Sequence, residues 1–539
     1  MLYFSITNLV LFAFIISLHN YNNTIIKELI SFDFIVKIKI KGKGNQAIVC
    51  PEISSTDNQK YPDEIYIEKD NEIIKNITGG IYNIDLEEDE NTIIMKWNTY
   101  PNSTRRMFKN CTNITEIDLA LFNLEAIANM GNMFLNCYNL NIIKFGDYST
   151  SSLNYTYGMF NGCRRLASLD LSMFDTSKVV NMQFMFSNCY ALKSLNLSNF
   201  KTSNVKSFSQ MFRKCENLET LDLSNFDTSL ATNISYMFSD CKRLSNLTIS
   251  SFDISNIKDM SYLFNECKSL ISIDVSNFIS NFDISNAQFM KGMFKGCSSL
   301  THLDLSHFNT SKVVNINEIF RNCYNLRFLN LSNWENYNIN EMHSLFRVCH
   351  SLKEIDLSNF NTSLAKRING MFMNCYSLIS LDLSSFDTSL VYNMSCMFYG
   401  CKSLISLNIT HFNTSNVKYF DNMFAGCSSL TSLDISNFLS KRILKLENMF
   451  EGCTNLSYIN MSNFIEYNKT ISIYSNLFKG VKNNLIICIH QNYTPIITGL
   501  VNEIGCATIY CGEDLLRINK KYNIYKNECI TVCPEELPF

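Results

Sequence analysis

A large excess of charge of either sign is missing from this sequence. It holds 46 Lys and Arg against 49 Asp and Glu, so its 539 residues carry a formal net charge of −3. Proteins that bind nucleic acid or an acidic surface usually carry a basic excess. We therefore expect no nucleic-acid partner.

Residues that commonly carry catalysis are also scarce. Only 7 His and 18 Gly occur, and no glycine loop of the kind that holds phosphate is present. Two histidines, His307 and His411, each stand ten residues past a regularly spaced cysteine, but neither comes with a nucleophile or carboxylate found only there. We expect a protein that is not an enzyme and uses no cofactor.

Long apolar runs are absent beyond the start of the chain. Residues 9–18 form an apolar run whose length is typical of a signal-peptide core and short for a membrane span. The run lacks a basic segment before it and a clear cleavage site, so a buried strand or an uncleaved anchor remains an alternative. We expect a signal peptide over residues 1–20 and no membrane span beyond it.

What the sequence has in abundance is a repeated unit marked by cysteine. Fourteen of the 21 cysteines recur 26 residues apart, with one step of 30 between Cys267 and Cys297. This cysteine ladder comprises Cys111, Cys137, Cys163, Cys189, Cys215, Cys241, Cys267, Cys297, Cys323, Cys349, Cys375, Cys401, Cys427 and Cys453. A fixed period of this size predicts a solenoid.

Each unit has the same apolar pattern. Leucine-type residues stand three, six and eight positions after the cysteine, an aromatic stands at eleven, and Met-Phe precedes the next cysteine. The alternation from Leu221 to Leu223 predicts a short strand, and Phe-Asp-Thr-Ser at residues 226–229 favours a turn. Apolar residues then return at about every third position, as in residues 417–424, which suits a 3₁₀ turn or short helix. Only stacking buries these positions, so we expect one long parallel sheet.

The string Met-Phe-x-x-Cys-x-x-Leu-x-x-Leu-Asp-Leu-Ser-x-Phe-Asp-Thr-Ser closely resembles the repeats of the BspA-like leucine-rich repeat surface proteins of bacteria and protists. The resemblance covers residues 107–480. It implies a right-handed leucine-rich repeat solenoid with a concave parallel β-sheet. It also implies a secreted or cell-surface protein, often associated with adhesion, and it does not name a ligand.

The flanks of the array differ from the repeats. Residues 31–98 contain several runs that alternate at period two, so we expect a small all-β N-terminal cap, with a separate ligand-binding domain as the alternative. Residues 481–505 are a degenerate terminal repeat, as a cap should be. Residues 506–539 form a cysteine-rich tail, which resembles the segment that follows the repeats in some protist BspA-like proteins.

The cysteines fall into two groups. Those of the ladder point into the stack beside Phe and Leu, so we expect free buried thiols, although rungs about 5 Å apart could also pair vertically. In the tail we expect two disulfides of undetermined pairing. A zinc site is the alternative, but gaps of four and three residues do not match the usual zinc spacing. The tail cysteines are Cys506, Cys511, Cys529 and Cys533, and Cys50, Cys396 and Cys488 have no assignment.

The outward position of each strand, seven residues after the cysteine, is rich in Asp and Asn. Carboxylates at strand spacing repel one another, so this column is a candidate binding stripe for a cationic or hydroxyl-rich partner, or for calcium. The alternative is a hydrogen-bond ladder that fixes the strand register. The candidate residues are Asp170, Asn196, Asp222, Asp274, Asp304, Asn330, Asp356, Asp382, Asn408 and Asp434.

Glycosylation sequons are frequent, as in a surface glycoprotein. The candidates are Asn76, Asn113, Asn154, Asn233, Asn246, Asn309, Asn361 and Asn413. These features together predict a secreted or cell-surface protein that binds a protein or glycan ligand through its concave sheet face. The first alternative is a structural wall or coat component cross-linked through the tail, and the second is an intracellular scaffold.

Overall fold

A computed structural model describes most of the chain between residues 34 and 530. The described ranges are 34–50, 61–69, 72–78, 83–101, 103–273, 275, 286–306, 308, 310–334, 337–438, 442–462, 475–482, 485–489, 507–510, 521–523 and 528–530. The expected signal peptide over residues 1–20 lies outside them. Within these ranges, no helix has the length and apolar character that crossing a membrane requires.

A six-stranded sheet, in the order β4-β3-β6-β1-β7-β8, begins the structure. Its strands are β1 (Ile35–Lys41), β3 (Glu64–Lys69), β4 (Glu72–Thr78), β6 (Glu90–Lys96), β7 (Ile114–Leu119) and β8 (Ile142–Phe145), and a separate pair joins β2 (Gly44–Ala47) to β5 (Asn83–Leu86). In β1, Ile38 and Ile40 are buried while Lys39 and Lys41 are exposed, as a period of two requires.

The same sheet joins the N-terminal segment to the repeats. Strand β1 pairs antiparallel with β7, with Ile38 opposite Ile117, and β7 pairs parallel with β8, with Ile117 opposite Ile143. Strands β7 and β8 already belong to the first two repeats. The hydrophobic end of the stack is therefore covered by continued strand pairing, without a separate interface.

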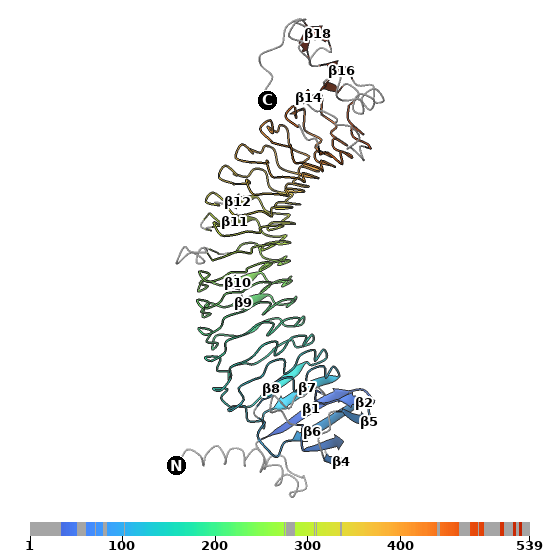
Figure 1. Ribbon diagram of the computed structural model, residues 1–539. Helices are drawn as coiled ribbons and strands as arrows, with labels where there is room; N and C mark the ends of the chain where they lie inside the picture. The colour runs from blue at the N-terminus through green and yellow to red at the C-terminus, as the bar shows by residue number, and fades with distance from the viewer. Residues whose placement is uncertain are drawn as a thin grey trace.

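The repeats form a curved β-solenoid of about thirteen turns (Figure 1). Their strands pair in parallel at corresponding positions, for example Leu221 with Leu247 and Leu433 with Ile459. The later strands are β9 (Thr220–Asp222), β10 (Asn246–Thr248), β11 (His302–Asp304), β12 (Phe328–Asn330), β13 (Ser432–Asp434), β14 (Tyr458–Met461), β15 (Ile486–Ile489) and β16 (Ala507–Tyr510), followed by the antiparallel pair β17 (Lys521–Asn523) and β18 (Glu528–Ile530). The predicted leucine-rich repeat solenoid with parallel strands is confirmed.

The return segment differs from the expected 3₁₀ turn or short helix. Across the described repeats it consists of consecutive β-turns, in which residues one and five positions before the cysteine have positive φ. Asn132 and Asn136, with φ of 56° and 62°, are typical. Left-handed residues at this interval cannot continue a right-handed helix. They instead let backbone groups pair with the next repeat, as when the Phe108 N–H donates to the Met133 carbonyl at 2.9 Å.

The Phe-Asp-Thr-Ser segment forms the predicted turn. The hydroxyl of the buried Thr202 donates to the carbonyl of Asp227 in the next repeat at 2.9 Å and accepts from the Asp227 N–H at 2.8 Å. The Asp227 carboxylate in turn accepts from the Ser229 N–H at 2.9 Å. This turn therefore links neighbouring repeats through a buried hydroxyl.

The cysteine ladder runs through the core as fourteen free, buried thiols, as expected from the sequence. From Cys137 onward, each Sγ donates to the carbonyl of the phenylalanine that precedes the previous cysteine, as Cys137 does to Phe108 at 3.0 Å. These phenylalanines stack in their own column, where Phe372 lies 5.4 Å from Phe346 and 5.9 Å from Phe398 between ring centroids. Sulfur and ring columns thus fill the interior side by side.

Most of the cysteine-rich tail lies outside the described residues. Cys529 lies in β18, while Cys506, Cys511 and Cys533 are not described. The two disulfides expected among these four cysteines stay a prediction. Cys488, which the sequence left unassigned, is disulfide-bonded.

Val348 offers a test of the left-handed turns. Its φ is 66°, although a β-branched side chain is strained in this region, and the equivalent residue in other repeats is often asparagine. We expect Val348→Asn to raise the free energy of unfolding by about 1 kcal/mol. Urea denaturation measures the change, and the reverse substitution Asn322→Val, at a φ of 64°, should lower stability by a similar amount. No change in both variants would contradict the strain.

Candidate binding surface

The predicted Asp and Asn column lies on the outer face of the strands, and each described member has a local structural role. Its side-chain oxygen accepts a hydrogen bond from the backbone N–H two residues later, which makes an Asx turn where the strand ends. Asp222 accepts from Ser224 at 2.9 Å, and Asp382 accepts from Ser384 at the same distance. The backbone N–H and hydroxyl of the serine lower the pKa of both carboxyl groups.

Nine of the ten candidate residues are described, and Asp274 lies outside the described residues. The same Asx bond occurs at Asp170, Asn196, Asp222, Asp304, Asn330, Asp356, Asp382, Asn408 and Asp434. Two contacts between side chains of the column link neighbouring repeats: Asn460 donates to Asp434 at 3.0 Å, and Lys144 lies 3.9 Å from Asp118. The column is therefore a series of turns more than a ladder between strands, and its binding role stays a prediction.

No group of three or more acidic, histidine or cysteine side chains comes together as a metal site in the part of the chain that the structure describes. The column of residues seven positions after each cysteine keeps its carboxylates one repeat apart. In Asp222, Asp356 and Asp382, one carboxylate oxygen already accepts the hydrogen bond of the Asx turn. A calcium-binding stripe would need several oxygens converging on one point.

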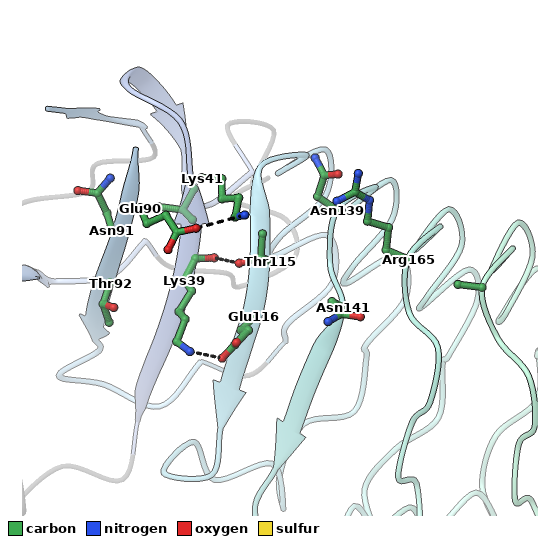
Figure 2. Close-up of a pocket in the computed structure, with 12 residues that line it drawn as sticks. Lys39, Lys41, Glu90, Asn91, Thr92, Thr115, Glu116, Asn139, Asn141 and Arg165 are labelled. Carbon is green, nitrogen blue, oxygen red and sulfur yellow. Dashed lines mark hydrogen bonds and ion pairs between the residues drawn. The ribbon is translucent and has the colours of Figure 1, made fainter. Parts of the chain in front are cut away.

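A polar groove of about 710 Å³ opens where the N-terminal sheet meets the first repeats (Figure 2). Strands β1 and β6 form one side, and β7 with the turns of the next repeats forms the other. Its lining residues are Lys39, Ile40, Lys41, Glu90, Asn91, Thr92, Thr115, Glu116, Asn139, Asn141, Arg165 and Ala191. None of the predictions from the sequence included this groove.

Ion pairs neutralise several of the charged side chains that line the groove. Lys39 lies 2.8 Å from Glu116, and Lys41 lies 3.2 Å from Glu90 (Figure 2). Arg165, by contrast, makes no ion pair with any residue that the structure describes, and it lies beside Asn139 at the rim (Figure 2). The arrangement suits a small polar ligand with an anionic group. The alternation of Lys and Ile in β1 was the available sequence signal.

A second polar cluster, also missed, follows the turns of the central repeats. Glu318 pairs with Lys295 at 2.5 Å and with Arg321 at 2.7 Å. Burial opposes ionisation of Glu318, but the two cations hold its pKa below the ordinary value. One repeat further on, Arg367 pairs with Glu341 at 2.6 Å. These ion pairs join side chains of neighbouring turns, so the cluster stabilises the edge of the stack.

The predicted sequons differ in accessibility. Asn246 and Asn413 are exposed, whereas Asn113 donates its amide to Gln46 at 2.6 Å and so contributes to the contact with the N-terminal sheet. Asn154, Asn233 and Asn361 are partly buried, and the side chains of Asn76 and Asn309 lie outside the described part. Glycan occupancy at all eight stays a prediction.

Two solved structures resemble this chain at low identity. One is a leucine rich cell surface protein from Faecalibacterium prausnitzii A2-165, with 16% sequence identity and a TM-score of 0.32, matched over 75% of this chain and 85% of that one. The other is a leucine-rich repeat protein from Eubacterium ventriosum ATCC 27560, with 17% identity and a TM-score of 0.25, matched over 55% and 75% respectively. No curated protein matches the chain.

One family model matches the repeats directly. It is described as "Mycoplasma protein of unknown function, DUF285", and it matches residues 102–219, 154–278, 192–302, 246–354, 290–382, 315–406 and 377–485. These overlapping matches cover the array from residue 102 to residue 485, well over half of the 539 residues. The narrower 26-residue BspA-like motif stays an inference from the sequence. The chain belongs to the DUF285 family of repeat proteins.

Proposed function

We propose that this chain is a secreted or cell-surface leucine-rich repeat protein that binds a protein or glycan through the outer face of its parallel strands. One observation carries the proposal: inward positions are constant from repeat to repeat, while outward positions vary. Three residues after the cysteine, four successive repeats all have leucine. Five residues after it, the same repeats have His302, Phe328, Glu354 and Ser380.

Rigidity supports a role in binding. Every repeat is tied to the next by backbone hydrogen bonds in its turns and by buried side chains, as at Phe346, whose N–H donates to Met371 at 2.9 Å. A surface held in this way loses little conformational entropy when it binds, so many weak contacts can add up. The solenoid is suited to presenting such contacts along its length.

The cysteine ladder is compatible with an oxidising exterior. Burial raises the pKa of Cys189 and Cys375 to about 12, which keeps both as thiols at neutral pH. The thiolate is the reactive form of cysteine, so the ladder resists oxidation wherever the protein resides. Fourteen free thiols therefore do not argue for an intracellular location.

Labelling of intact cells tests the location. A membrane-impermeant amine reagent should modify exposed lysines such as Lys353 and Lys402 on intact cells, in the same amount as after lysis. A cytosolic protein measured in parallel should be labelled only after lysis. If this chain follows the cytosolic control, the proposal fails and the intracellular scaffold replaces it.

A further inference from the structure

The outer face carries a concentrated apolar region in the central repeats. Phe328, Ile379 and Ile405 are 51%, 47% and 52% exposed, and Tyr324 is exposed beside them at 40%. We call this region, formed by Tyr324, Phe328, His350, Tyr376, Ile379 and Ile405, the apolar strip. Exposed apolar groups that cluster in this way mark interaction sites more often than isolated ones do.

The members of the strip are distributed over four successive repeats, and several of them are in direct contact. The Ile405 N–H donates to the Ile379 carbonyl at 3.3 Å, so these residues lie side by side on adjacent turns. The rings of Tyr324 and His350 stack at 5.1 Å, and those of His350 and Tyr376 stack at 4.3 Å. The rings of the strip therefore run through three successive repeats, and Ile379 and Ile405 lie on adjacent turns, while Phe328 stands two repeats before Ile379 with Lys353 and Glu354 in the repeat between them.

The fold does not require apolar residues at these positions. Four residues after the cysteine, where the strip has Ile379 and Ile405, other repeats have Lys193, Glu219 and Ser245. All three of these polar side chains are exposed, and their repeats stack with the same turns and thiols. The apolar character of Ile379 and Ile405 therefore has no structural explanation in the stack itself.

The geometry favours a protein ligand over a sugar. Sugar rings bind aromatic residues through free ring faces, but both faces of His350 are covered by tyrosines. The outer face of Tyr376 is covered by the Lys402 ammonium, 4.6 Å from the ring centroid. Besides these stacked rings the strip offers Phe328 and the branched aliphatic side chains of Ile379 and Ile405, which pack against apolar side chains and give no hydrogen bonds to hydroxyl groups.

Cations lie among the apolar side chains. Arg327 and Lys353 are exposed at the same repeat position as Ile379, and neither forms an ion pair with a residue that the structure describes. With Lys402 they make three cations, against the single carboxylate Glu354 in the strip's own columns. The acidic column at Asp356 and Asp382 lies further along the strand, with its carboxylates bonded into Asx turns.

We infer that the apolar strip docks an apolar segment of a partner protein that also bears acidic side chains. The inference rests on the proposed binding function and adds the partner class and the docking position. Apolar side chains of the partner cover Phe328, Ile379 and Ile405, while its carboxylates face Arg327, Lys353 and Lys402. Burial of the aliphatic groups provides affinity, and the charges fix orientation.

A peptide library displayed on phage and selected against the full chain tests the inference. Selected peptides should combine aromatic or aliphatic residues with Asp or Glu. The triple variant Phe328→Ser, Ile379→Ser, Ile405→Ser should bind them at least tenfold more weakly. The matched control Leu230→Ser, Leu364→Ser, Leu390→Ser removes equally exposed apolar residues from another column and should bind normally. Circular dichroism shows whether both variants keep the fold.

Three results would overturn the inference: no selected peptides, peptides that bind both triple variants equally, or peptides rich in Lys and Arg. Strip-dependent binding to a glycan array would also overturn it, because the partner would then be a sugar. Each of these results leaves the proposed location intact, since labelling of intact cells decides that independently. Conversely, labelling only after lysis would refute the surface location without affecting the peptide result.

Discussion

Raising the pH from 8 to 10 under reducing conditions is expected to unfold the solenoid. Burial raises the pKa of every thiol in the cysteine ladder, to about 12 at Cys189, Cys375 and Cys453 and well upward at the others. An unfolded cysteine titrates near 8.5. Between these values the unfolded chain releases protons that the folded chain retains, so stability falls as the pH rises.

The effect is large because the ladder is long. Each buried thiol contributes a loss of about 1.4 kcal/mol per pH unit above the unfolded pKa. If all fourteen thiols ionise on unfolding, the slope reaches about 19 kcal/mol per pH unit, which exceeds the total stability of a typical domain. Below about pH 8 the thiols are protonated in both states, and the dependence should vanish.

Urea denaturation at half-unit steps from pH 7 to pH 10, with a phosphine reductant, measures this slope. The double variant Cys215→Ala, Cys241→Ala removes two titrating groups and should reduce the slope by about 2.7 kcal/mol per pH unit. The variant will be less stable at neutral pH, because alanine leaves small cavities, but the slope does not depend on that offset. A stability that stays constant between pH 8 and pH 10 would contradict the buried thiol ladder.

The repeat could be read from the sequence because each of its columns has a simple physical requirement. Leu221 and Leu223 are buried and Asp222 is exposed, as alternation predicts. Cysteine at a fixed period, beside Phe and Leu, favoured a ladder of small buried thiols over vertical pairing, and the structure has free thiols there. Asn and Gly are the most frequent residues directly before the cysteine, which is typical of left-handed turns. The apolar spacing of about three residues indicated a 3₁₀ turn or short helix instead, and so the left-handed turns were not predicted.

The candidate sites were harder to predict, for two different reasons. The groove at Arg165 forms between β1 and turns more than 90 residues later, so the alternation of Lys and Ile in β1 indicates an exposed strand face but not the residues that lie across from it. The acidic column has a structural role that the sequence could not reveal. An Asp that accepts a hydrogen bond from its own backbone, as Asp222 does from the Ser224 N–H, looks the same in the sequence as an Asp that contacts a ligand. The apolar strip was visible in principle, since Ile379 and Ile405 stand at an outward position that other repeats fill with polar residues.

The substitution Phe372→Ala is expected to lower the free energy of unfolding by about 3–5 kcal/mol. Phe372 is fully buried and stacks on the ring of the repeat before it and the ring of the repeat after it. Its removal leaves a cavity and weakens two interfaces between neighbouring repeats at once, and such interfaces dominate the stability of a stack.

Phe328 provides a matched control for this substitution, because it is the same residue type in a nearby repeat and is 51% exposed. Phe328→Ala should change stability by less than about 0.5 kcal/mol. Urea denaturation followed by circular dichroism compares the two variants. Equal losses would mean that the ring column does not hold the repeats together. A large loss at Phe372 alone, with the Phe328 variant still folded, also shows that the stack does not depend on Phe328, so this exposed side chain of the apolar strip is free to serve binding.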